Sequence, residues 1–153
     1  MEENLVKMLT QKRMTISTAE SCTGGLIAGR IINVSGASSV YNEGFITYSN
    51  EAKEKYLGVK HETLEQYGAV SHETVEEMAK GCAAASGADV ALVSSGIAGP
   101  EGGTDDKPVG LVYVACFVKG NVKVIRKIYD GNRQEVRSQA VSTAIELAID
   151  MIK

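Results

Sequence analysis

The sequence predicts an α/β protein: a three-layer α/β/α sandwich around a five-stranded mixed sheet, mostly parallel with one antiparallel strand. Segments with apolar residues at helical spacing alternate with short β-branched or apolar runs, which is typical of parallel α/β sheets. Two strand-like segments near the C-terminus are joined by only Lys119, Gly120 and Asn121, which predicts a hairpin and therefore one reversed strand.

The first third of the chain predicts two helices, two strands and a short third helix. Apolar residues at helical spacing in the first dozen positions predict the opening helix, and the β-branched run 15–19 predicts the first strand. A second apolar stripe begins at Leu26 and stops between Asn33 and Gly36. Residues 40–48 are expected to form the second strand, after which Ser49 or Asn50 can cap a helix over 51–57 that stops at Gly58.

The rest of the chain predicts three helices and three strands. Short and longer helices are expected over 62–67 and 71–85, then a strand over 90–94, a loop over 96–108, and hairpin strands over 111–118 and 122–129. The last helix opens with the capping-box spacing of Asn132 and Glu135 and runs to the C-terminus. We expect one domain over residues 1–153.

Composition excludes several function classes. There are 16 Lys and Arg against 19 Asp and Glu, a net charge of −3, without any block of like charge, which disfavours binding to nucleic acid through a basic face. Cys22, Cys82 and Cys116 form no CxxC pair, and the chain has only two histidines, so neither zinc nor a disulfide framework is expected. Without a signal peptide or membrane span, we expect a cytoplasmic protein.

Ser21 is the first candidate nucleophile. It follows a predicted strand and precedes a helix, as Tyr48 and the loop that begins at Gly96 also follow strands, so all three are expected at one edge of the sheet. Backbone N–H groups of Thr23, Gly24 and Gly25 could stabilise an oxyanion there. The alternative is that Ser21 or Thr23 only caps the helix. Cys22 is a rival nucleophile that ranks below Ser21, because lone cysteines are more often small buried apolar residues.

Lys53 is the candidate base for Ser21. His61 and His72 lie in polar helical segments far from any strand end, so neither is well placed to be the histidine of a Ser-His-Asp triad. To act near pH 7, the pKa of Lys53 must fall by roughly 3 from about 10.4, a difference of about 4 kcal/mol that requires burial or a cationic neighbour. The alternative is an exposed lysine on a helix surface, and Tyr48 alone is equally compatible with a packed aromatic residue.

Two further features suggest an anionic ligand. The loop from Gly96 to Pro108 contains four glycines and two prolines, and glycines let backbone amides approach a phosphate, although a mobile surface lid is the alternative. Within it, Gly96, Gly99, Gly103 and Thr104 are the candidate ligand contacts. Arg133 and Arg137 stand four apart at the start of the last helix, where they form a candidate clamp for phosphate or carboxylate; solvated surface arginines are the alternative.

Three segments together resemble the C-terminal domain family of CinA proteins, the bacterial nicotinamide mononucleotide (NMN) deamidases. They are AESCTGG at 19–25, TYSNEAK at 47–53 and SGIAGPEGGTDDKPVG at 95–110, and the resemblance spans nearly the whole chain. It implies a three-layer sandwich with a five-stranded mixed sheet and a homodimer or higher homo-oligomer. It further implies a stand-alone member, since CinA proteins often carry an additional N-terminal domain.

The resemblance also implies an amidohydrolase that converts NMN to nicotinic acid mononucleotide and ammonia in pyridine nucleotide salvage, without a metal or cofactor. Ser21 corresponds to the nucleophile, Lys53 to the base, and Tyr48 to an assisting group. A non-catalytic nucleotide-binding or regulatory module, in which Ser21 only hydrogen-bonds to a phosphorylated ligand, is the alternative hypothesis.

Overall fold

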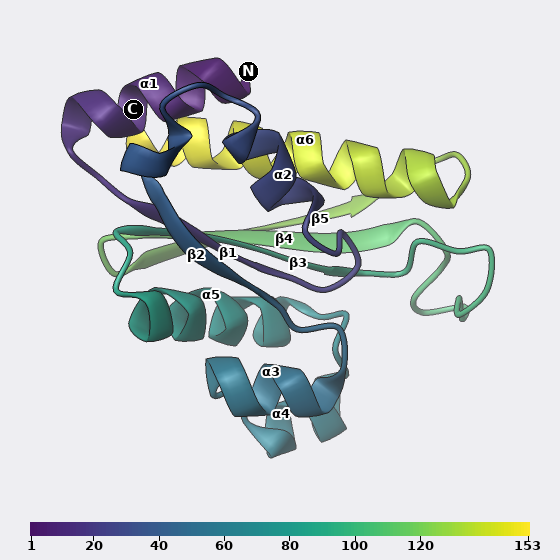
Figure 1. The fold of residues 1–153 in the computed structure, drawn as a ribbon. Coiled ribbons are helices and arrows are strands. Elements are labelled where there is room, and N and C mark those ends of the chain that lie inside the picture. Colours follow the sequence, from purple (N-terminus) through teal and green to yellow (C-terminus); the bar gives the residue numbers. More distant parts are fainter.

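The protein is a five-stranded sheet covered by helices on both faces, as seen in a computed structural model that describes residues 1–153 (Figure 1). The elements in chain order are α1 (Glu2–Lys12), β1 (Ile16–Glu20), α2 (Leu26–Ile32), a short 3-10 turn (Ala37–Ser39), β2 (Tyr41–Ile46), α3 (Asn50–Leu57), α4 (His61–Tyr67), α5 (His72–Ser86), β3 (Val90–Gly96), β4 (Leu111–Val118), β5 (Asn121–Ile128) and α6 (Arg133–Ile152). This order agrees with the predicted one, and the predicted three-layer sandwich is confirmed.

The sheet has the order β2-β1-β3-β4-β5. β1 pairs in parallel with β2 and β3, and β4 is antiparallel to both β3 and β5, so β4 alone runs against the other four strands. The hairpin turn is one residue shorter than expected. Lys119 and Gly120 both have positive φ, 48° and 87°, which is the conformation of a two-residue turn that matches strand twist, and Asn121 already belongs to β5.

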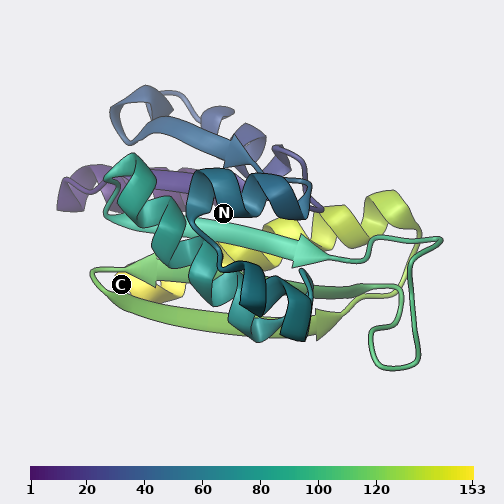
Figure 2. The same cartoon turned by 90° about the horizontal axis from the view of Figure 1, so that it is seen from below.

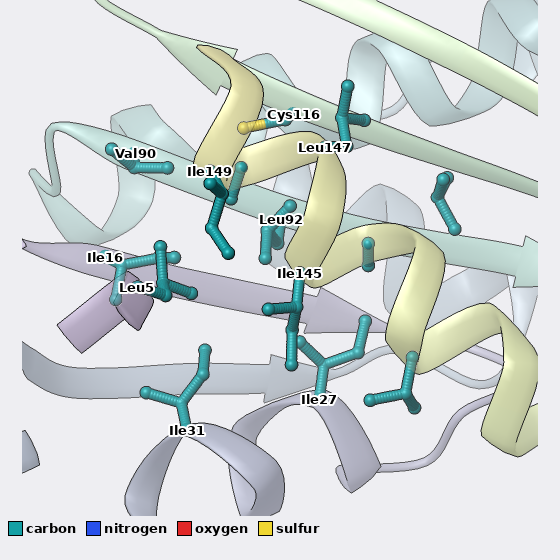
Figure 3. Close-up of a cluster of buried hydrophobic side chains, with 14 of the residues drawn as sticks. Leu5, Ile16, Ile27, Ile31, Val90, Leu92, Cys116, Ile145, Leu147 and Ile149 are labelled. Carbon is teal, nitrogen blue, oxygen red and sulfur yellow. The ribbon is translucent and has the colours of Figure 1, made fainter. Parts of the chain in front are cut away.

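The two faces of the sheet bury different apolar layers. α1, α2 and α6 pack on one face, and α3, α4 and α5 lie on the other (Figures 1 and 2). Along β3, Val90 and Leu92 join the first layer while Ala91 and Val93 join the second, as the alternation of side chains in a strand requires. The first layer contains 26 buried residues and the second 12, so the larger core lies on the face that α6 covers. Figure 3 shows part of this larger core, including Leu92, Ile145 and Leu147.

Helix ends follow the local sequence signals. Asn132 accepts a hydrogen bond from the Glu135 amide at 2.9 Å, and the Glu135 side chain accepts from the Asn132 amide at 2.9 Å, which confirms the predicted capping box of α6. Of the two candidate caps for α3, the residue that acts is Ser49, whose Oγ accepts from the Ala52 amide at 3.0 Å. That cap fixes the start of the helix that carries Lys53.

Close packing of α3 on α5 depends on one glycine. A Cβ at Gly81 in α5 would lie 1.8 Å from the carbonyl oxygen of Leu57, the last residue of α3. Only glycine permits this approach, so Gly81 allows α3 to pack directly against α5. Lys53 is thereby enclosed rather than left on a helix surface, with only 1% of its surface exposed.

Candidate active site

A cavity of about 290 Å³ lies at the edge where β1, β2 and β3 end. Its walls come from the turn after β1, the turn after β2, the segment between α4 and α5, and the loop after β3. The lining residues are Ser21, Cys22, Tyr48, Lys53, Ala69, Val70, Ser95, Gly96, Ile97, Ala98, Gly99, Glu101, Gly102 and Arg133. Ser21, Tyr48 and the Gly96 loop therefore meet at one edge, as parallel strand ends require.

A larger hollow of about 510 Å³ lies elsewhere, bordered by the hairpin turn and the end of α6. Its lining consists of Lys12, Met14, Val118, Lys119, Asn121, Met151, Ile152 and Lys153. None of these side chains is a hydroxyl or thiol nucleophile. The smaller cavity, which holds Ser21 and Lys53, is accordingly the candidate active site.

Ser21 and Lys53 are in direct contact at the floor of the cavity. Lys53 Nζ lies 3.0 Å from Ser21 Oγ, and it donates to the carbonyl oxygens of Thr47 at 2.8 Å and Tyr48 at 3.3 Å. The hydrogen bonding between β1 and β2 continues one residue past the end of β2, because the Thr47 amide donates to the Glu20 carbonyl at 2.9 Å. That extra hydrogen bond brings the turn after β2 beside Ser21.

Burial lowers the pKa of Lys53 from its ordinary value of 10.5 to about 8, because the ammonium loses its hydration inside the protein. The negative charge of Glu51 acts in the opposite direction but does not outweigh the burial. No carboxylate forms an ion pair with Lys53. The shift favours the neutral amine by about 3 kcal/mol relative to an exposed lysine. The exposed-lysine alternative is thus excluded.

Cys22 lines the same cavity, yet its thiol is a poor nucleophile. Burial raises the pKa of Cys22 to about 11, so the thiol stays protonated near neutral pH. Burial also raises the pKa values of Cys82 and Cys116, which lie in the core. The hydroxyl of Ser21 is the cavity's best-placed nucleophile, because it alone contacts the buried amine.

Thr23, Gly24 and Gly25 do not line the cavity, although they form the turn behind Ser21. The Thr23 side chain is fully buried, with its hydroxyl on Glu20 and Ser94. The Gly24 amide donates to the Ser21 carbonyl at 3.1 Å, so it is already engaged. The backbone N–H groups of Cys22, Thr23 and Gly25 donate to no acceptor within the protein, and of these three residues only Cys22 lines the cavity.

The two arginines of α6 reach different targets. Arg133 donates to the carbonyl of Gly99 at 2.8 Å and to the Tyr48 hydroxyl at 3.2 Å, at the rim of the cavity. Arg137 donates to the carbonyl oxygens of Cys22 at 2.9 Å and Thr23 at 3.3 Å, and it does not line the cavity. They do not form one clamp: only Arg133 faces the cavity, and Arg137 holds the turn after Ser21.

The Gly96 loop contributes its first half to the cavity. Gly96 and Gly99 line it, whereas Gly103 and Thr104 lie farther out. Thr104 closes a turn with Lys107, since its amide donates to the Lys107 carbonyl at 2.7 Å and its hydroxyl accepts from the Lys107 amide at 3.0 Å. The side chain of Lys107 donates to the Tyr67 carbonyl and ties the loop to the end of α4.

Several lining residues carried no signal in the sequence. Ala69 and Val70 precede the cap of α5, and small apolar side chains in a connector do not indicate a site. Glu101 and Gly102 belong to the Gly96 loop and line the cavity, although the sequence predicts ligand contacts at other positions of this loop. Both histidines lie away from the cavity, and the His61 side chain is 62% exposed between Glu54 and Glu65.

A family model described as the CinA C-terminal domain matches residues 1–152. The chain belongs to the CinA C-terminal domain family. A CinA-like protein of Kosmotoga olearia is 53% identical over 146 residues, which are 95% of this chain and 35% of that protein. The chain spans about a third of the length of the curated relatives it matches.

Solved CinA structures share the whole fold. The competence/damage inducible protein CihA of Agrobacterium tumefaciens has a TM-score of 0.93 at 43% identity, covering 99% of this chain and 96% of that one. A competence-damaged protein (CinA) superfamily protein of Klebsiella pneumoniae has a TM-score of 0.95 at 36% identity, covering 99% and 94%. These names state no reaction, so the chemistry rests on the site. No helix of this CinA-family chain is long and apolar enough to cross a membrane.

Proposed function

We propose that this CinA-family chain is an amidohydrolase that converts NMN to nicotinic acid mononucleotide and ammonia through Ser21 and Lys53. The observation that carries the proposal is the 3.0 Å contact between Ser21 Oγ and a buried amine whose pKa is lowered to about 8. A neutral amine has two N–H groups and one lone pair. With the N–H groups on the carbonyls of Thr47 and Tyr48, the lone pair is free to accept the Ser21 proton.

The reaction divides into acylation and hydrolysis. Ser21 Oγ bonds to the carboxamide carbon as its proton passes to Lys53, and the oxyanion accepts a hydrogen bond from the free amide of Cys22, which lines the cavity. The C–N bond then breaks, and the nitrogen leaves as ammonia with the proton returned by Lys53 and assisted by the Tyr48 hydroxyl. Water, deprotonated by Lys53, attacks the acyl-enzyme and releases the carboxylate and Ser21.

The remaining lining residues fit the rest of an NMN molecule. Arg133 at the rim supplies a guanidinium for the phosphate, and the Gly96–Gly99 segment supplies backbone close to the ribose. The proposal includes the expected cytoplasmic homo-oligomer acting in pyridine nucleotide salvage. Sedimentation of the purified protein over a range of concentrations measures the assembly state.

The direct test is ammonia release from NMN by the purified chain, with NMN binding measured in parallel by calorimetry. Ser21→Ala and Lys53→Met are expected to abolish turnover while binding persists. Lys55→Met is the matched control, because Lys55 lies on the same helix but is exposed, and it should leave the rate unchanged. A well-folded parent that binds NMN but releases no ammonia would instead support the non-catalytic nucleotide-binding module.

A further inference from the structure

Glu20 is a buried carboxylate that the proposed reaction does not use. It is the last residue of β1 and the immediate neighbour of Ser21, with 1% of its surface exposed, and it forms no ion pair. A carboxylate taken out of water is costly unless hydrogen bonds replace its hydration. Its partners therefore indicate what this group does for the fold around Ser21.

All the hydrogen-bond partners of the Glu20 side chain belong to the turn and helix that follow Ser21. Oε1 accepts from the Thr23 hydroxyl at 2.5 Å and from the Ile27 amide at 2.8 Å, and Oε2 accepts from the Ala28 amide at 3.0 Å. The N-cap residue of α2 is Gly25, which has no side chain to cap these amides. Glu20, at the end of the preceding strand, therefore caps α2. Its hydrogen bonds join the residues before and after the turn 21–25 and hold that turn in place.

The same turn is also tied to β3 through Ser94. The Thr23 hydroxyl has one hydrogen, which is donated to Glu20, so the 2.7 Å contact between Thr23 and Ser94 is a hydrogen bond donated by Ser94. The Ser94 carbonyl accepts from the Ser21 amide at 3.1 Å. Thr23 links the Glu20 carboxylate to the strand that holds the backbone of Ser21.

Arg137 fixes the opposite side of the turn and sets the direction of one free amide. It draws the Cys22 carbonyl toward α6. In a planar trans peptide the N–H points opposite to the C=O, so the Thr23 N–H points away from Arg137. Without Glu20, this peptide would be held on one side only.

We propose that Glu20 is a positioning residue, which acts through Thr23 and the first amides of α2 to hold Ser21 Oγ against Lys53 Nζ and to keep the Cys22 amide free. This inference rests on the proposed function. Misplacing a nucleophile by about 1 Å can cost about 100-fold in rate, so the role should be visible in kcat. Glu20 itself touches no substrate.

The test compares Glu20→Gln with a matched carboxylate elsewhere. Glu77 accepts from the Lys60 amide at 2.9 Å and from the Thr63 hydroxyl at 2.6 Å, so it braces α4 as Glu20 braces α2, outside the cavity lining. Glu20→Gln should lower kcat for NMN by at least about tenfold with KM changed by less than about threefold. Glu77→Gln should leave kcat unchanged, and equal loss in both variants would overturn the proposal.

Two substitutions of Thr23, one that removes its hydroxyl and one that keeps it, test the same link. Thr23→Val removes the hydroxyl at constant shape and should lower kcat as Glu20→Gln does, whereas Thr23→Ser keeps the hydroxyl and should restore kcat to within about threefold of the parent. The double variant Glu20→Gln/Thr23→Val should be no worse than the poorer single variant, since both act through one link. Melting curves for each variant, with kcat measured well below the transition, separate positioning from loss of folded protein. Additive losses, or a kcat that follows only the folded fraction, would reject the proposal.

A second assay, which needs no substrate, tests the positioning role of Glu20 independently of whether NMN is the substrate. Sulfonylation of Ser21 by phenylmethylsulfonyl fluoride, followed by mass spectrometry, reports the reactivity of the serine without any substrate. If the parent is labelled but releases no ammonia, NMN is the wrong substrate, and slower labelling of Glu20→Gln than of Glu77→Gln still supports the positioning role. If the parent turns NMN over and Glu20→Gln matches it in both assays, the positioning role is rejected. A parent that neither reacts nor turns over rejects both proposals.

Discussion

Lys53 Nζ lies 3.0 Å from Ser21 Oγ, although 32 positions of chain separate the two residues. Three independent packing features produce this contact: the end of β1 directly before Ser21, the Ser49 cap that starts α3, and the close approach of α3 to Gly81. Each is fixed by a different part of the sequence. The contact is therefore a property of the whole fold rather than of either motif alone.

The rate of ammonia release should rise with pH. Because the neutral amine is the active form and the pKa of Lys53 is lowered to about 8, kcat/KM is expected to increase tenfold per pH unit below about 7 and to level off above about 9. Initial rates between pH 6 and 10, in buffers of constant ionic strength, measure the midpoint. A midpoint near 10.5 would show that Lys53 is not the base.

The free energy of unfolding should also depend on pH because the pKa of Lys53 is lowered in the folded protein. Between pH 8 and 10.5 the unfolded chain binds a proton at Lys53 that the folded chain has lost, so stability rises with pH through this window. The stability of the parent minus that of Lys53→Met should increase by about 2 kcal/mol between pH 8 and 10. The pKa values of Cys82 and Cys116 are raised by burial in both proteins, so the contributions of these two thiols cancel in the difference.

Denaturant unfolding at several pH values measures this difference. Lys55→Met removes an exposed lysine from the same helix and serves as the control. A parent-minus-Lys53→Met difference that stays constant across the window would mean that the folded and unfolded chains hold this proton equally well.

The sequence was sufficient to predict the element order and the edge of the sheet that carries the site. Parallel strands end on the same side, so Ser21, Tyr48 and Gly96 could be placed together from their positions after predicted strands. The burial of Lys53 could not be predicted, because it depends on the packing of α3 against α5 at Gly81, a contact between segments far apart in the chain. The lowered pKa follows from that packing and not from the neighbouring residues in sequence.

The two arginines show a second limit of sequence reasoning. Residues four apart share one helix face, which suggested a single clamp for Arg133 and Arg137. They are nevertheless about 6 Å apart along the helix axis, which is enough for them to reach different loops. Thr23 is a similar case. Its position in a glycine-rich turn predicts a ligand contact, but its hydroxyl is buried and donates to Glu20.

Arg133 is expected to act on the phosphorylated part of the substrate. Arg133→Ala should raise KM for NMN by at least about tenfold, because a guanidinium bound to phosphate is worth about 1.5 to 3 kcal/mol. For nicotinamide riboside, which lacks the phosphate, the same change should alter KM much less. Steady-state kinetics with both compounds measure the ratio, and an equal effect on both would place the phosphate elsewhere.

Arg137 is expected to act on the turn after Ser21 instead. Arg137→Met keeps most of the apolar stem but removes the hydrogen bonds to the Cys22 and Thr23 carbonyls, which should lower the free energy of unfolding by about 1 to 3 kcal/mol. Because the turn holds the nucleophile, kcat should fall by the same factor for NMN and for nicotinamide riboside. Thermal unfolding and parallel assays of the two substrates measure both effects. A loss confined to NMN would mean that Arg137 reaches the phosphate after all, and that the two arginines act together.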